Sequence, residues 1–239
     1  MNAHWDSVDA KWKLFIEEEF KKEYMVTLRE FVKARRDNNT VLPEAQLSVL
    51  FRPFLEVPFY NLKVIIIGDS PYTSKDEIDG LAFSSKSSRK PVALKRILDE
   101  VHLDYFNGNT GGKEVFTTNS LSMWAKQGIL MINSVWTTDE GKYGSHENKG
   151  WEIFTENLIK FILRHNHTRL VYMIWSKNPK RYVDLLDATK NLLLLDNHPA
   201  AAKPEEWGRK NHFTKCNAFL SKHYMNIPYK GAIGWHLIK

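Results

Sequence analysis

Residues 62–67 read Leu-Lys-Val-Ile-Ile-Ile, and Gly68 ends the run. A short apolar stretch rich in β-branched residues that stops at a glycine is typical of a strand buried on both faces of a parallel sheet. Similar apolar runs follow at 129–132, 170–175 and 192–195. Together these runs predict a central, mainly parallel, four-stranded sheet.

Helical patterns separate the predicted strands, and they cover the ranges 91–101, 119–126, 151–164 and 179–186. Because strand and helix alternate, we expect an α/β fold with helices flanking the sheet on both faces. Ahead of the first strand, apolar residues recur at helical spacing over 7–36 and predict one long helix. Pro43 is expected to open a short helix that runs through Leu50.

The bulk composition bounds the class of protein. The chain has 239 residues, of which 43% are hydrophobic and 26% charged, and we find no internal repeat. These values favour one folded domain, 1–239, over a disordered chain. Lys and Arg number 34 against 28 Asp and Glu, which gives a net charge of +6. A basic chain makes a polyanion a plausible partner without naming it.

Cys216 is the single cysteine of the sequence. It excludes an intramolecular disulfide, and it cannot by itself build an iron–sulfur or Cys-rich zinc site. The first six residues do not combine a basic start with an apolar run, and no apolar stretch approaches the roughly 20 residues that span a bilayer. We therefore expect an intracellular monomer that is not bound to a membrane.

Polar and aromatic residues collect in the segments that follow the predicted strands, at 68–85, 133–148, 175–180 and 196–210. In parallel sheets, binding sites form beyond the carboxyl ends of the strands. Loops that gather an Asn, a His and aromatic rings can hold a planar heterocycle by stacking and by hydrogen bonds to its edge. Basic residues close by can meet phosphates. The pattern indicates a nucleobase site.

Five ordered segments carry a family pattern from about residue 10 to the C-terminus. They are 50–72, then 80–84, then 128–133, then 145–155, and finally His198-Pro199 with 212–217. In order and spacing they resemble the family-1 members of the uracil-DNA glycosylase superfamily. The resemblance implies a monofunctional glycosylase that acts on DNA and needs neither cofactor nor metal. Such an enzyme flips a pyrimidine base out of DNA and hydrolyses its N-glycosidic bond.

The resemblance also implies roles for individual residues. Phe83 would stack on the flipped base, and Asn133 would pair with the base edge, because an amide offers both a donor and an acceptor. Tyr72 would close off the C5 position. His198 would donate a hydrogen bond to the base O2 as negative charge builds there, for which a neutral imidazole suffices.

Further residues are implied as contacts to the DNA backbone. The hydroxyls are those of Ser84, Ser176 and Thr214, and the cations are those of Lys203 and Lys210. For the two lysines, a solvated surface role is nearly as well supported as a phosphate contact.

The catalytic loop departs from the family pattern. Ser70 stands at the position of the family's water-activating Asp, and a serine cannot carry the negative charge that orients water and stabilises a sugar cation. General-base assistance is typically worth ~10²–10⁴-fold in rate. Asp69 is adjacent to Ser70, although neighbouring side chains generally point different ways. Whether the loop re-aims Asp69 as the substitute carboxylate is left open, and both residues stay catalytic candidates.

The segment after His198-Pro199 departs as well. Alanines occupy 200–202, where the family has a phosphate-binding Ser and an intercalating Leu, and alanine is too small to wedge into a base stack. Trp207 is the candidate for that role, unless flipping relies on a base pair that is already weakened. Thr73 stands where the family has His.

Three functions remain open. The first is an active glycosylase for uracil or for a modified pyrimidine, such as those of phage DNA. The second is a catalytically impaired protein that keeps DNA binding, for example as a replication accessory. The third, an unrelated nucleotide-binding protein, would need a phosphate-cradling Gly-rich loop, whereas Gly68 and Gly80 are isolated. We favour the active enzyme, because Phe83, Asn133 and His198 are all retained.

Overall fold

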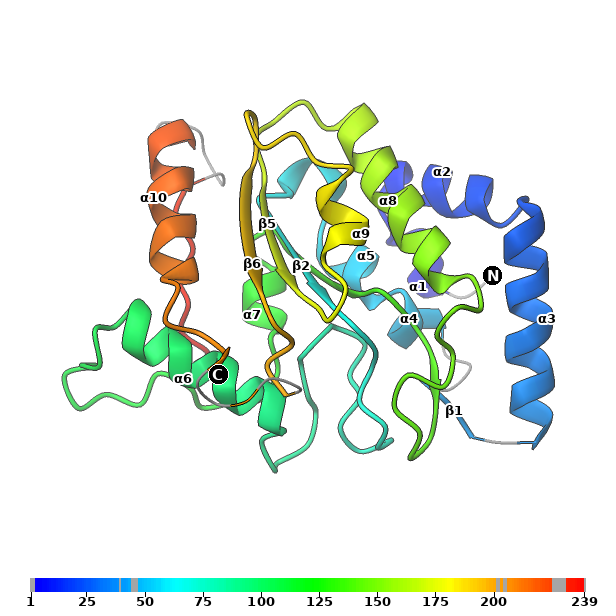
Figure 1. Ribbon diagram of the computed structural model, residues 1–239, viewed down its shortest axis with the longest axis horizontal. Helices are drawn as coiled ribbons and strands as arrows, with labels where there is room; N and C mark the ends of the chain where they lie inside the picture. The colour runs from blue at the N-terminus through cyan, green and yellow to red at the C-terminus, as the bar shows by residue number, and fades with distance from the viewer. Residues whose placement is uncertain are drawn as a thin grey trace.

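The computed structural model describes residues 3–38, 40–43, 47–200, 203, 206–224 and 231–238. Its central sheet consists of β2 (Val64–Gly68), β3 (Ile129–Asn133), β5 (Val171–Trp175) and β6 (Leu192–Asp196). The strand order is β3-β2-β5-β6, and every pairing is parallel (Figure 1). All residues of β2 and β5 are buried, which explains why these strands read as continuous apolar runs. The predicted four-stranded α/β fold is confirmed.

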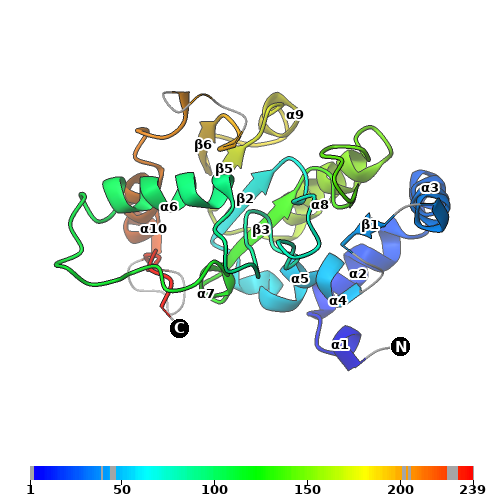
Figure 2. The same cartoon turned by 90° about the horizontal axis from the view of Figure 1, so that it is seen from below.

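Helices cover both faces of this sheet. In the two views of Figures 1 and 2, α6 (Val92–Asp104) and α10 (His212–Tyr224) lie on one face, and α8 (Trp151–His165) lies on the other. The short helices α7 (Ser122–Ala125) and α9 (Lys180–Val183) also fall within predicted helical ranges. Within the described ranges, none of these or the other helices has the length and apolarity needed to cross a membrane.

The prediction of one helix over 7–36 is wrong. The segment forms α2 (Ala10–Glu19) and α3 (Glu23–Asn38), and Asp9 caps α2 by accepting a 2.8 Å hydrogen bond from the Lys11 amide. The break follows Glu19, which is buried and whose carboxylate accepts hydrogen bonds from the Tyr24 hydroxyl and the Lys22 ammonium. Apolar spacing alone cannot reveal this break, because the apolar stripe continues across it.

Several elements were not predicted. They are α1 (Ala3–Asp6), α5 (Arg52–Glu56), the 3₁₀ helix η1 (Phe59–Asn61), α10, and the antiparallel pair β1 (Val41–Leu42) with β4 (Thr138–Asp139). The helix α4 (Leu47–Leu50) falls within the range predicted for the helix that Pro43 opens. Residues 44–46, which the predicted helix at Pro43 includes, lie outside the described ranges. The signal for α10 was present, because Phe213, Cys216, Leu220 and Tyr224 recur at helical spacing and are all buried.

Candidate active site

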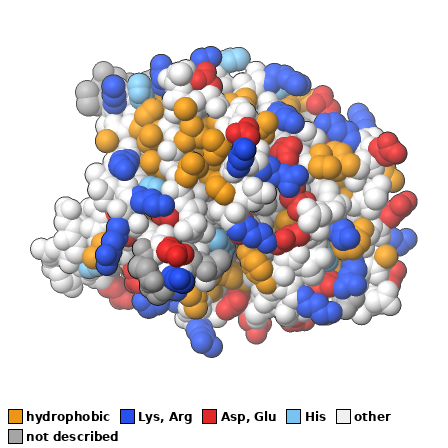
Figure 3. All heavy atoms as spheres, in the orientation of Figure 1, with side chains coloured by type: hydrophobic (Ala, Val, Ile, Leu, Met, Phe, Trp, Pro, Cys, Tyr) orange, Lys and Arg blue, Asp and Glu red, His pale blue; other side chains and the backbone are white. Residues whose placement is uncertain are grey.

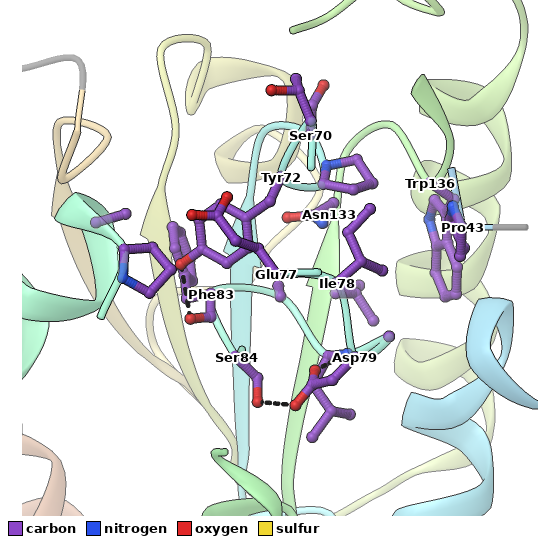
Figure 4. Close-up of a pocket in the computed structure, with 18 of the residues that line it drawn as sticks. Pro43, Ser70, Tyr72, Glu77, Ile78, Asp79, Phe83, Ser84, Asn133 and Trp136 are labelled. Atoms are coloured by element: carbon purple, nitrogen blue, oxygen red, sulfur yellow. Dashed lines mark hydrogen bonds between the residues drawn. The ribbon is translucent and has the colours of Figure 1, made fainter. Parts of the chain in front are cut away.

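A cavity of about 300 Å³ opens at the carboxyl end of the sheet. Its walls come from the segment after β2, the end of β3, the segment between β4 and α8, and the segment after β6. Phe83, Asn133 and His198 all line it, so the structure brings together three residues from distant parts of the chain. In Figure 4, Tyr72, Phe83 and Asn133 surround the centre of the cavity, with Ser70 at one end.

Phe83 adopts an unusual backbone conformation that turns its ring into the cavity. Its φ is 64°, a region that costs an L-residue about 1–2 kcal/mol. The Tyr72 hydroxyl donates a 2.8 Å hydrogen bond to the Phe83 carbonyl, which helps to hold this conformation. The ring is buried, and its centroid lies 5.5 Å from that of the His198 ring. Phe83 therefore presents a buried aromatic ring to the cavity beside His198.

Asn133 is the last residue of β3 and pairs in register with Gly68 of β2. A Cβ atom at position 68 would lie 2.7 Å from Asn133 Oδ1 and 2.8 Å from Phe83 Cζ. The missing side chain of Gly68 is thus what lets the amide and the ring approach each other. The Asn133 carbonyl accepts a 3.2 Å hydrogen bond from the Thr155 hydroxyl, while its side-chain amide makes no hydrogen bond to another described residue.

His198 is buried, and its Nδ1 accepts a 3.2 Å hydrogen bond from the Ala200 amide. In the neutral imidazole the proton must then reside on Nε2, which makes Nε2 the donor. Burial lowers the pKa of His198, the Asp69 charge opposes this effect, and the Lys177 charge adds to it. His198 is therefore a neutral N–H donor at physiological pH.

Ser70 lines the same cavity and is only 8% exposed. Its hydroxyl has no hydrogen-bond partner among the described residues. Leaving a buried polar group unpaired costs about 1–3 kcal/mol. The Ser70 hydroxyl is consequently available to a water molecule or to a polar atom of a ligand.

Asp69 is placed differently from Ser70. Its Oδ1 accepts a 2.5 Å hydrogen bond from the Ser176 hydroxyl, and the Lys177 amide donates to the carboxylate at 3.3 Å. Asp69, Ser176 and Lys177 line a neighbouring cavity of about 190 Å³ and not the one lined by Phe83. The structure therefore does not aim Asp69 at the base pocket, and the Ser176 hydroxyl is already engaged.

Two predicted DNA contacts need correction. Ser84 is fully buried, where its hydroxyl donates a 2.5 Å hydrogen bond to Asp79 and accepts one from the Leu121 amide, so it anchors the loop from inside. Trp207 is 8% exposed and packs edge-on against Trp175, with ring centroids 5.3 Å apart. A ring packed into the core in this way cannot enter a base stack.

Three of the remaining predicted DNA contacts lie at the surface, whereas Ser176 is buried. Lys203, Lys210 and Thr214 are exposed. Lys210 Nζ pairs with Asp196 Oδ1 at 2.6 Å, and the Thr214 hydroxyl donates to the Asp104 carboxylate. The alanines at 201 and 202 lie outside the described ranges. Figure 3 shows Lys and Arg side chains spread over one face of the molecule, while apolar side chains gather over β6.

The cavity also contains residues that sequence reasoning missed. Glu77, Val92, Trp136 and Tyr143 line it. Tyr143 belongs to the predicted site segment 133–148, and its aromatic ring was the available signal. In the part of the chain that the structure describes, no group of three or more His, Cys, Asp or Glu side chains is placed to hold a metal ion.

Known proteins match this sequence over most of its length. Residues 54–227 match the family model described as the uracil DNA glycosylase superfamily. The uracil-DNA glycosylase of Amoebophilus asiaticus is 38% identical over 220 residues, covering 91% of this chain and 96% of that protein. The uracil-DNA glycosylase of Borreliella burgdorferi is 35% identical over 224 residues, covering 92% of this chain and 96% of that protein.

The fold agrees with these sequence matches. The crystal structure of mimivirus uracil-DNA glycosylase superposes with a TM-score of 0.78 at 23% identity, covering 99% of this chain and 90% of that one. Since the family model spans more than half of the sequence and relatives above 30% identity align over nearly its whole length, the chain belongs to the uracil-DNA glycosylase superfamily.

Proposed function

We propose that the protein is a monofunctional DNA glycosylase that flips uracil, or a modified pyrimidine, out of DNA and hydrolyses its N-glycosidic bond. One observation carries the proposal: Phe83, Asn133 and His198 line a single cavity. The family and the names of its relatives support the same activity.

The base is held by three contacts. It stacks on Phe83, and the Asn133 amide, unpaired within the described residues, supplies a donor and an acceptor to the base edge. Tyr72 is fixed by its hydrogen bond to the Phe83 carbonyl and closes off the C5 position. Extrusion of the base costs a few kcal/mol, and these contacts offset that cost.

In this proposal, the protein accelerates bond cleavage by stabilising the charges that develop in the transition state. As the glycosidic bond breaks, the base leaves as an anion and the sugar becomes cationic. His198 Nε2–H donates to the base O2, and a preorganised donor of this kind is worth roughly 10²–10³-fold in rate. The buried Ser70 hydroxyl, unpaired within the described residues, holds the attacking water. The water oxygen bonds to the C1′ atom of the sugar cation, and the proton that the water loses goes to the base anion. The nearby Asp69 carboxylate contributes negative charge without touching the water.

The identity of the base is the finer part of the proposal. Tyr72 favours uracil, because it leaves little room for a C5 substituent. Ser70 and Thr73 differ from the family pattern and line the same cavity, which favours a pyrimidine with altered polar groups. Base release from duplexes containing uracil, hydroxymethylcytosine or glucosylated cytosine distinguishes these substrates.

A second candidate is a catalytically impaired DNA-binding protein. It is favoured by the combination of an uncharged Ser70 in the cavity and an Asp69 carboxylate held outside it by Ser176. This candidate predicts affinity for DNA without base release. It also predicts that His198→Ala causes no change in base release.

The base-release assay tests the proposal with matched variants. Wild-type protein should produce abasic sites on at least one duplex of the panel, and His198→Ala should lower the rate about 10²-fold or more. His167→Ala, at an exposed histidine remote from the cavity lining, serves as the control and should release base at the wild-type rate. Absence of release from every duplex, despite DNA binding, favours the second candidate. Trapping of a covalent adduct by borohydride would overturn the monofunctional mechanism.

A further inference from the structure

Few of the described residues that line the base cavity are exposed to solvent, and these lie at its mouth. Among the described residues that line the cavity, three are exposed, namely Val92, Tyr143 and Ala200. Only Tyr143 of these carries an aromatic ring, and it is 51% exposed. Tyr143 thus stands out at the entrance through which a nucleotide must pass.

The segment that carries Tyr143 is firmly held on both sides of the ring. The Thr138 hydroxyl donates a 2.6 Å hydrogen bond to the Lys142 carbonyl, and the Ser145 hydroxyl accepts a 2.8 Å hydrogen bond from the Asp139 amide. The Gly141 amide donates to the Thr73 carbonyl at 2.8 Å, which ties this segment to the one containing Ser70. Tyr143 is therefore presented in a fixed place and needs little ordering on binding.

The position of Tyr143 relative to His198 defines which part of the nucleotide it faces. The two ring centroids lie 6.2 Å apart in an edge-to-face arrangement. His198 addresses the base O2, and O2 neighbours the glycosidic nitrogen. Tyr143 is exposed beside His198 at the mouth, so it lies on the side of the deoxyribose and the adjoining nucleotides.

Extrusion of a base opens the stack, and proteins that open a base stack frequently insert a side chain into it. The alanines at 200–202 are too small for this role, and Trp207 is packed against Trp175. Within the described lining of the cavity, Tyr143 is the aromatic side chain that is both exposed and at the mouth.

We propose that Tyr143 stacks on the DNA beside the extruded nucleotide and thereby stabilises the flipped state, an inference that rests on the proposed function. Stacking between a base and an aromatic side chain is worth about 1–3 kcal/mol, or roughly 5- to 150-fold in affinity. The contact forms only after the DNA helix has opened. It therefore raises the affinity for DNA that lacks a base more than the affinity for intact duplex.

Binding measurements test this without requiring catalysis. Affinities of wild type, Tyr143→Ala and Tyr143→Phe are measured by fluorescence anisotropy on a duplex with a tetrahydrofuran abasic analogue and on the intact duplex of the same sequence. Tyr143→Ala should weaken binding to the abasic duplex about tenfold and leave the intact duplex within about threefold. Tyr143→Phe should restore wild-type binding, because the ring is retained. Tyr60→Ala is the matched control, since Tyr60 is 61% exposed and does not line the cavity.

Base release supplies a second readout. For Tyr143→Ala, release from duplex should fall about tenfold, while release from single-stranded DNA, where no stack must open, stays within about threefold. If wild type releases no base but Tyr143→Ala selectively loses affinity for the abasic duplex, the proposed function fails and this inference stands. Equal affinity of Tyr143→Ala and wild type for the abasic duplex overturns the inference, as does an equal loss on both duplexes or failure of wild type to bind either.

Discussion

The Ser176 hydroxyl donates a 2.5 Å hydrogen bond to Asp69, and this contact holds the carboxylate outside the base cavity. Because Asp69 does not line the cavity that Ser70 lines, Asp69→Asn should reduce base release by less than about tenfold, well short of the ~10²–10⁴-fold expected for a general base. Single-turnover kinetics on the best substrate measure this. A loss of 10³-fold or more would identify Asp69 as the substitute carboxylate after all.

Ser70 carries a buried hydroxyl without a partner among the described residues, and it stands where the family has a carboxylate. Ser70→Ala should lower base release about tenfold if the hydroxyl holds the water, with no loss of thermal stability, because no existing hydrogen bond is removed. Ser70→Asp should raise release of uracil by about tenfold or more, since it restores a general base. Parallel assays on uracil and modified duplexes separate a gain in rate from a change in substrate.

The pH dependence of base release follows from His198. Burial lowers the pKa of this imidazole below its ordinary value of 6.5, so the neutral form persists at pH 6.5 and somewhat below. Protonation of Nδ1 would set it against the Ala200 amide, which is itself a donor. We expect kcat/KM to stay level from pH 8 to 6.5 and to fall only at lower pH.

The Lys177 charge provides the matching control for this pH profile. Lys177 lowers the pKa of His198, so Lys177→Met should raise that pKa and move the acid limb toward higher pH. The hydrogen bond from the Lys177 amide to Asp69 is unaffected, because it comes from the backbone. An acid limb that stays in place would mean that another group controls the profile.

His212 should make the fold sensitive to acid. Its Nδ1 accepts a 3.1 Å hydrogen bond from Trp175 Nε1, and burial lowers the pKa of His212 to about 4. The unfolded chain takes up this proton near pH 6.5, whereas the folded chain does so only near pH 4. Stability from this group is therefore complete above pH 6.5 and declines on acidification, by about 2 kcal/mol at pH 5.

His212→Gln tests this linkage, because the amide oxygen can still accept from Trp175 but does not titrate. Comparing unfolding free energies at pH 7.5 and pH 5, the variant should lose about 2 kcal/mol less than wild type. His167→Gln, at an exposed histidine, should behave like wild type. Equal acid sensitivity of wild type and His212→Gln would assign the effect to other groups.

The centre of the sheet was predictable because β2 and β5 are buried along their whole length and are therefore uninterrupted by polar residues. The partly exposed strand β6 was predictable because it is a run of four leucines. The break between α2 and α3 was not predictable, since it lies beside Glu19, whose buried carboxylate also accepts a 2.9 Å hydrogen bond from Asn157 of α8, a contact that forms only in the folded chain. Spacing reports which side of a helix is apolar and not where the helix stops.

The convergence of Phe83, Asn133 and His198 was predicted from the resemblance, and their common cavity agrees with it. The burial of Ser84 and Trp207 could not be predicted from the sequence, because a hydroxyl or an indole is as suitable for a DNA contact as for an interior contact. Their partners decide the matter, because Ser84 contacts the Leu121 amide and Trp207 packs against Trp175, and both partners come from other parts of the fold. Tyr143 was not predicted as a site residue, because its proposed role depends on its exposure at the cavity, which the sequence does not reveal.

Gly68 lies behind the contact between Asn133 and Phe83, two residues that line the cavity. With only a hydrogen atom on its α-carbon, the main chain of β2 itself becomes the surface beneath the amide of Asn133 and the ring of Phe83. The separation of the amide and the ring thereby depends on the pairing of β2 with β3 and on the absence of a side chain at position 68. Attempts to re-engineer this glycosylase for bulkier bases have to change other residues of the cavity lining, because any side chain at position 68 would displace Asn133 and Phe83.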